Sequence, residues 1–151
     1  MKAISIGIAG LGTVAQGVLT LLAANRSLIE QRSGVSVDVV RVASRSAKPD
    51  VDLHGADFST DVMDLLSDSR IDLIVELIGG ETLAKQLIVG ALSNGKAVVT
   101  ANKAVIALYG NELSRQALRF EAAVAGAIPI IHALQQGLVA NRFTAVRGII
   151  N

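Results

Sequence analysis

A glycine-rich turn between an apolar strand and a helix constrains the fold of this chain more than any other feature. The apolar residues 3–9 suit a buried strand, the sequence GLGTVAQG begins at Gly10, and a helical pattern follows. This order is typical of folds that hold the pyrophosphate of a dinucleotide, because Gly10 permits a tight turn and Gly12 lets phosphates approach the backbone. Ala15 stands where the usual pattern has its third glycine. The order of strand, turn and helix therefore predicts a dinucleotide-binding domain.

The same stretch allows a second interpretation, a secretory signal peptide, because Lys2 precedes an apolar run that ends at Ala23 and Ala24. Polar residues and four glycines interrupt this run, which fits a turn better than a continuous signal helix. Elsewhere the sequence has no apolar run of the roughly 20 residues that a membrane span needs. We therefore expect no membrane partner.

The composition narrows the classes of partner and compartment. A net charge of +1 and 3% aromatic residues offer little to a nucleic acid. The sequence contains no cysteine, so a reducing cytoplasm is the simplest location. Charged residues make up 18% of the chain, against roughly 25% in a typical domain. Either a strongly apolar core or a surface covered by another domain or subunit would explain this deficit.

Strand and helix patterns alternate along the 151 residues, which suggests one domain. Strands are predicted at residues 3–9, 35–43, 71–75, 97–100, 119–124 and 143–150. Helices are predicted at residues 14–31, 61–66, 83–93, 104–118 and 130–139. This alternation predicts an α/β fold with a doubly wound parallel sheet, a Rossmann-type dinucleotide-binding domain. Ligands of such sheets bind at the carboxyl ends of the strands.

The end of the second predicted strand bears on the choice between NADP and NAD. Ser44 and Arg45 end this strand and Lys48 follows shortly after, whereas Glu30 belongs to the preceding helix. A cation at this place suits a 2′-phosphate, and a charge-assisted hydrogen bond contributes about 1.5–3 kcal/mol. Alternatively, Arg45 and Lys48 are ordinary solvated charges. We expect NADPH to bind more tightly than NADH.

Three further segments, ELIGG from Glu76, VVTANKA from Val98 and FEAAVAGAIPII from Phe120, complete a recognisable pattern. Together with the glycine turn, they resemble homoserine dehydrogenase over essentially the whole chain. Members of that family interconvert aspartate 4-semialdehyde and homoserine with NAD(P)H, on the route to threonine, methionine and isoleucine. Another NAD(P)-dependent amino-acid or semialdehyde dehydrogenase and a non-catalytic nucleotide sensor are the alternatives.

The resemblance implies a role for individual residues. Lys103 is the implied catalytic residue, because hydride delivery builds negative charge on a carbonyl oxygen that an ammonium stabilises. The implied cofactor contacts are Gly10, Leu11, Gly12, Thr13, Val14, Ser44, Arg45, Ile78, Gly79, Thr100 and Lys103. Glu76 is expected near the cofactor edge without an assigned role.

The resemblance also implies a monovalent cation such as sodium. Its implied ligands are Glu121, Val124, Gly126 and Ile128. Spacing alone favours a different role for Glu121, which is to cap a loop or to pair with Arg119. Ala127 departs from the family pattern and would narrow the nicotinamide region if its backbone needed a positive φ.

The resemblance finally implies that residues 1–151 form the NAD(P)-binding domain and stop where a substrate domain would begin. We therefore expect the chain to bind nucleotide without turning over homoserine. In the full-length protein we expect a small-molecule substrate and a homo-oligomer.

Overall fold

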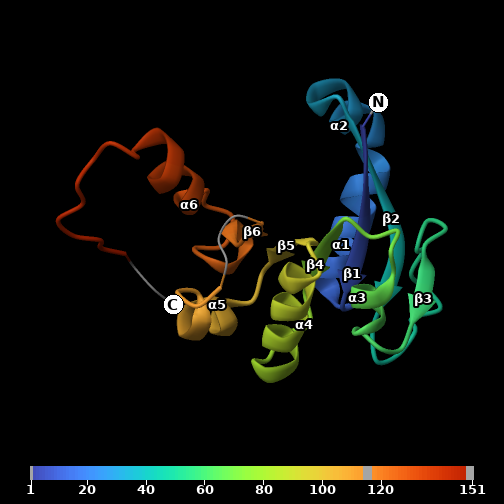
Figure 1. Ribbon diagram of the computed structural model, residues 1–151. Helices are drawn as coiled ribbons and strands as arrows, with labels where there is room; N and C mark the ends of the chain where they lie inside the picture. The colour runs from blue at the N-terminus through green and yellow to red at the C-terminus, as the bar shows by residue number, and fades with distance from the viewer. Residues whose placement is uncertain (1, 114–116, 149–151) are drawn as a thin grey trace.

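The computed structural model describes residues 2–113 and 117–148. Its sheet contains six strands in the order β3-β2-β1-β4-β5-β6, and every neighbouring pair is parallel. The strands are β1 Lys2–Ala9, β2 Val35–Ala43, β3 Asp57–Ser59, β4 Leu73–Glu76, β5 Ala97–Thr100 and β6 Leu118–Arg119. The predicted doubly wound parallel sheet is therefore confirmed (Figure 1).

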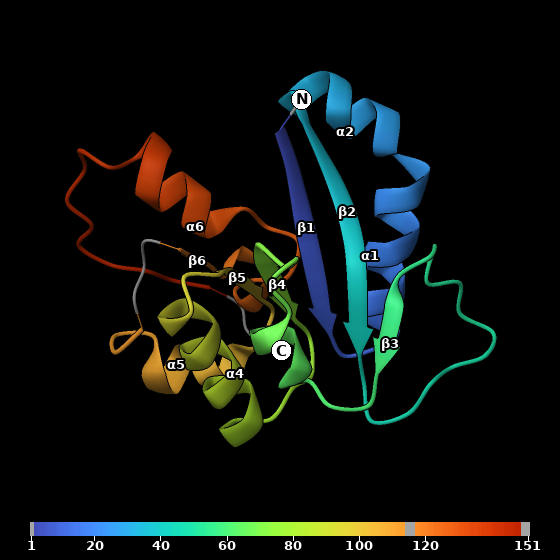
Figure 2. The ribbon, with the colours of Figure 1, turned by 45° about the vertical axis from the view of Figure 1, so that its right-hand side comes forward.

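Helices connect the strands and cover both faces of the sheet. They are α1 Thr13–Ala24, α2 Arg26–Ser33, α3 Asp64–Ser67, α4 Thr82–Ser93, α5 Lys103–Tyr109 and α6 Ile130–His132, with a 3-10 turn η1 Glu121–Ala123 and a π turn η2 Ala133–Gly137. Both ribbon views place α1 and α2 beside β1 and β2, and α4 and α5 toward β4 and β5 (Figures 1 and 2). None of the helices in the described part of the chain is long and apolar enough to cross a membrane.

The core divides into two apolar layers because successive strand residues point to opposite faces. Ile8 and Val42 face α1, where they pack with Ala15 and Leu19. Their neighbours along the strands face the other way and join the larger cluster beneath α3, α4 and α5. Leu87 represents this second layer and is fully buried. The sheet, including its carboxyl edge, therefore lies between two layers of helices.

Several predicted elements differ from the structure. The long first helix is two helices, because Asn25 leaves the helical region at φ −110° and ψ 16°. The helix predicted over residues 104–118 is the shorter α5, which begins at Lys103 and ends at Tyr109 with Gly110 as its C-cap, and residues 114–116 of the prediction lie outside the described chain. Strand 119–124 is reduced to two paired residues followed by η1. Residues 143–148 are exposed and outside any regular element, so that part of the last predicted strand is wrong, and residues 149–150 lie outside the described chain.

One strand was missed. β3 has only three residues and pairs with the last three residues of β2. So short a segment has no periodicity to detect, and its extended form comes from the neighbouring strand edge.

Candidate functional site

The turn after β1 requires glycine at its first position. Gly10 has φ +104°, and its N–H donates to the Ala43 carbonyl at 2.7 Å. A Cβ at Gly10 would lie 2.7 Å from the Leu77 carbonyl oxygen, closer than real Cβ contacts come. The turn therefore connects the ends of β1, β2 and β4 through backbone packing.

The second glycine opens space in front of a helix end. Gly12 is the N-cap of α1, and it supplies no side-chain cap. The first turn of α1 has no acidic residue, and a Cβ at Gly12 would have no atom within 4 Å. Amides at the beginning of a helix attract anions through their unpaired N–H groups and the helix dipole. This geometry fits the pyrophosphate of a dinucleotide, whereas Ala15 is fully buried and packs into the core.

The strand order places this turn at the switch point of the sheet. β1 lies between β2 and β4, so the chain builds outward from β1 in both directions. The loops after β1, β2, β4 and β5 consequently share the carboxyl edge, where doubly wound folds bind ligands. On the β2 side, Ser44 donates its N–H to the Ser59 carbonyl at 3.0 Å, and Arg45 is exposed.

On the other side of the switch point, a pocket of about 250 Å³ lies between the loops after β4 and β5. Three of the predicted site residues, Val14, Gly79 and Lys103, line it together. The exposed Lys103 is the first residue of α5. Ile78 instead packs its side chain against the core. The remaining lining residues are Glu76, Leu77, Ala101 and Asn102.

A hydrogen-bond network forms the wall of this pocket. Glu76 is fully buried; one carboxylate oxygen accepts the Ile78 N–H at 3.0 Å and the other accepts the Thr100 hydroxyl. Asn102 caps α5 by accepting the Val105 N–H at 3.0 Å. Sequence reasoning did not assign roles to Glu76 and Asn102. An acid ending an apolar strand and an asparagine before a helix were the available signals.

Glu121 has a different environment from Lys103. Its carboxylate accepts the N–H groups of Ile131 at 2.9 Å and His132 at 2.8 Å, which caps α6. Glu121 therefore caps a helix, whereas the alternative considered from the sequence was the cap of a loop. The other three predicted cation ligands, Val124, Gly126 and Ile128, lie in the loop between η1 and α6.

The backbone of this loop turns at two left-handed residues. They are Ala125 at φ 56° and Gly126 at φ 61°. Ala127 is not in the left-handed region, so its methyl group is compatible with the backbone there. The departure at Ala127 therefore does not strain the loop.

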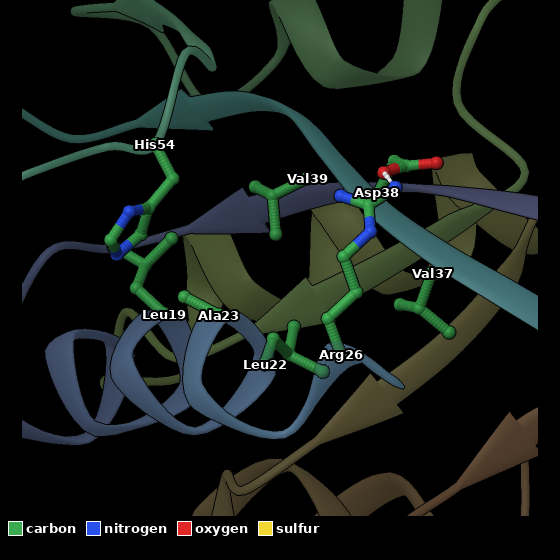
Figure 3. Close-up of a pocket in the computed structure, with 8 residues that line it drawn as sticks. All are labelled: Leu19, Leu22, Ala23, Arg26, Val37, Asp38, Val39 and His54. Atoms are coloured by element: carbon green, nitrogen blue, oxygen red, sulfur yellow. Dashed lines mark ion pairs between the residues drawn. The ribbon is translucent and has the colours of Figure 1, made fainter. Parts of the chain in front are cut away.

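A second hollow of about 280 Å³ lies between the second half of α1 and the strand β2 (Figure 3). Arg26 and Asp38 form an ion pair at 2.6 Å across one end of it. Its lining is otherwise mostly apolar, and it lies near the amino end of β2, away from the ligand edge. The hollow is lined by Leu19, Leu22, Ala23, Arg26, Val37, Asp38, Val39 and His54.

A doubly wound parallel sheet whose first strand turns through Gly10 into an uncapped helix defines a dinucleotide-binding domain. The family model described as "Homoserine dehydrogenase, NAD binding domain" matches residues 10–126. The chain belongs to this family, and its cofactor class is a nicotinamide dinucleotide.

Named relatives agree with this assignment. The homoserine dehydrogenase of Pseudomonas aeruginosa is 45% identical over 157 residues, covering 100% of this chain and 36% of the relative. That of Bacillus subtilis is 40% identical, covering 100% of this chain and 37% of the relative. The crystal structure of a homoserine dehydrogenase from Thiobacillus denitrificans has a TM-score of 0.86 and 48% identity, covering 94% of this chain and 35% of that one. The chain thus spans about a third of the length of these relatives.

Proposed function

We propose that this chain provides the cofactor site of an enzyme that interconverts L-aspartate 4-semialdehyde and L-homoserine with NADPH or NADH. The observation that carries the proposal is the pocket at the carboxyl edge, where Lys103, Val14 and Gly79 converge beside the uncapped end of α1. A non-catalytic nucleotide sensor would need the glycine turn but would have no use for an exposed ammonium at that pocket.

The residues of the chain divide the work along this edge. The first-turn amides of α1, at Thr13 and Val14, receive the pyrophosphate, and Gly12 leaves room for it. When bound, the cofactor supplies or accepts the hydride. Lys103 lies at the start of α5 and presents its ammonium to the carbonyl oxygen of the substrate, where negative charge develops during reduction. The carbonyl oxygen would gain its proton from the ammonium, which solvent reprotonates, and in the reverse direction the alcohol would lose its proton to solvent by the same route.

Lys103→Ala tests this role in a complete homoserine dehydrogenase that includes this chain. We expect kcat to fall by about 100-fold or more, in line with the loss of one charge-stabilising donor. The dissociation constant for NADPH, measured by calorimetry, should stay within about threefold, because Lys103 acts on the substrate oxygen. Lys2→Ala, an exposed lysine at the amino end of β1, is the control for loss of one positive charge. Near-normal turnover by the Lys103 variant would refute the assignment.

We infer further that the site prefers NADPH to NADH. Arg45 is exposed just beyond β2, and Ser44 before it donates its N–H to the carbonyl of Ser59, the last residue of β3. A guanidinium there would form charge-assisted hydrogen bonds to a 2′-phosphate, which corresponds to roughly a tenfold to hundredfold preference. Arg45→Ala should remove the preference, while Arg32→Ala on the exposed face of α2 should retain it. Equal dissociation constants for the two cofactors in the unmutated chain would contradict the inference.

A monovalent cation is a further part of the proposal. Each oxygen of Glu121 spends one acceptor position on a backbone N–H and retains another, and carbonyl oxygens follow at Val124, Gly126 and Ile128. An all-oxygen donor set of this kind suits a hard, weakly charged cation. The Ile128 carbonyl also accepts the Ile130 N–H at 2.8 Å. Activity that is unchanged when sodium is replaced by tetramethylammonium would exclude the cation.

The complete enzyme is expected to be a cytoplasmic homo-oligomer. Large apolar side chains of the described chain are exposed, among them Ile128 at 62%, Val139 at 73% and Val146 at 85%. Such surface suits coverage by another domain or subunit. Light scattering on the complete enzyme measures the assembly, and a monomer would contradict it.

A further inference from the structure

The pocket lining includes a buried carboxylate. Glu76 is the last residue of β4 and has no exposed surface. Removing a carboxylate from water is costly, so such a group persists only where hydrogen bonds or charges compensate it. The compensation here comes from neutral donors, the Ile78 N–H and the Thr100 hydroxyl. Glu76 therefore fixes both partners in a defined direction.

The register of the sheet explains why these partners meet. Glu76 and Thr100 are paired residues at the ends of β4 and β5. Paired residues on neighbouring strands point to the same face, so the two side chains contact each other at the carboxyl edge. The Thr100 hydroxyl donates a hydrogen bond to Glu76, and its oxygen accepts the Asn102 N–H at 3.0 Å. One directed chain of hydrogen bonds thus runs from the carboxylate to the residue that precedes Lys103.

Asn102 extends the network to the opposite wall. Its amide nitrogen donates to the Gly80 carbonyl at 2.7 Å, while its amide oxygen caps α5 through Val105. Gly79 and Gly80 both have left-handed backbones, at φ +70° and +71°, so the loop after β4 turns sharply at this contact. The loop after β4 and the beginning of α5 are consequently held at a fixed spacing.

We propose that Glu76 is a positioning residue, which acts through Thr100 and Asn102 to hold Lys103 at the reacting carbonyl of the substrate. The proposal rests on the proposed function, since it needs Lys103 to meet the substrate. Although Glu76 belongs to the pocket lining, it has no exposed surface with which to contact the substrate. Its carboxylate serves as the double acceptor that orients the hydroxyl of Thr100.

Substitutions that remove one hydrogen bond between Glu76 and its partners test this proposal. In Glu76→Gln the new NH₂ group faces either the Ile78 N–H or the Thr100 hydroxyl, so one donor loses its acceptor. Thr100→Val keeps the shape of the side chain and removes the hydroxyl, whereas Thr100→Ser keeps the hydroxyl. The valine and serine variants form a matched pair at one position.

The assays use a complete homoserine dehydrogenase that contains this chain. We expect Thr100→Val and Glu76→Gln to lower kcat by about 10-fold to 100-fold, the cost of a small misplacement of a reacting group. Although Thr100 is one of the implied cofactor contacts, the structure buries it completely and directs its hydroxyl to Glu76, so the Kd for NADPH should change by less than about threefold. Thr100→Ser should restore kcat to within about threefold of the parent. Combining Glu76→Gln with Thr100→Val should lower kcat no further than the single changes, because both interrupt the same chain of hydrogen bonds.

The outcomes separate this proposal from the proposed function. Absence of NADPH binding, or full activity of the Lys103→Ala variant, would defeat the proposed function itself. If Lys103→Ala is inactive but Thr100→Val turns over as fast as Thr100→Ser, Lys103 is catalytic and the positioning role is wrong. Melting temperatures of all variants detect loss of activity through unfolding. The proposal would also be overturned if Thr100→Ser lost as much kcat as Thr100→Val and its melting temperature fell in parallel.

Discussion

Alanine substitutions at Gly10 and at Gly12 should have different effects. Gly10→Ala should lower the stability of the fold, whereas Gly12→Ala should weaken nucleotide binding. At Gly10 the φ of +104° disfavours any side chain by roughly 1–2 kcal/mol. The new Cβ would also lie 2.7 Å from the Leu77 carbonyl oxygen, and relieving such overpacking costs about 1–3 kcal/mol. The sum is about 3 kcal/mol of unfolding free energy, which lowers the melting temperature of a chain of this size by about 6–12 °C.

Gly12→Ala is the matched control. Its backbone is extended at φ −76° and ψ −171°, and a Cβ there would meet nothing within 4 Å. The melting temperature should therefore stay within about 2 °C of the parent. The methyl group would instead occupy the space through which phosphates reach the amides of α1, and we expect Kd for NADPH to rise at least about tenfold.

Thermal unfolding followed by circular dichroism and calorimetric titration with NADPH measure the two effects. The reasoning is refuted if Gly10→Ala melts within about 2 °C of the parent. It is equally refuted if Gly12→Ala binds NADPH with an unchanged Kd.

Two further predictions concern stability remote from the pocket. The hydrogen bond from Arg70 lowers the pKa of Asp68 from 3.8 to about 2, so the stabilisation is present above about pH 4 and is lost as the pH falls through about 2. Asp68→Asn should cost about 2 kcal/mol at pH 7 and much less at pH 2.5 in urea titrations, and an equal cost at both would contradict the assignment. The buried Lys96 ammonium donates to the carbonyls of Asp68 at 2.7 Å and Ile71 at 2.8 Å. Lys96→Met should therefore lower the unfolding free energy, measured by urea titration, by about 2–3 kcal/mol. An unchanged urea midpoint would refute this prediction.

The sequence predicts those parts of the fold whose signals are local. β1, β2 and β5 are apolar runs bounded by glycine or polar turns, and their positions agree with prediction. The break at Asn25 does not follow from local pattern, because the residues on both sides of it form helices. β3 depends on its pairing with β2 and has no signal of its own.

The same distinction applies to the site. Gly10 directly follows β1 and Lys103 lies three residues beyond the end of β5, so their place at the carboxyl edge is predictable from the order of elements. The contact between Glu76 and Thr100 depends on the register of β4 against β5. Register is set by packing of whole strands, and therefore no spacing in the sequence reveals this contact.

The helices on the two faces of the sheet bury different numbers of side chains, and we expect them to open at different rates. α1 anchors itself with two fully buried side chains, Ala15 and Leu19, whereas α4 buries four. Segments with fewer buried contacts open at lower free energy, so the amides of α1 should exchange with deuterated solvent before those of α4. A nucleotide held at the beginning of α1 would suppress this opening, because it binds only the closed helix. The helix that we propose as the phosphate site would then be the one that a bound nucleotide stabilises.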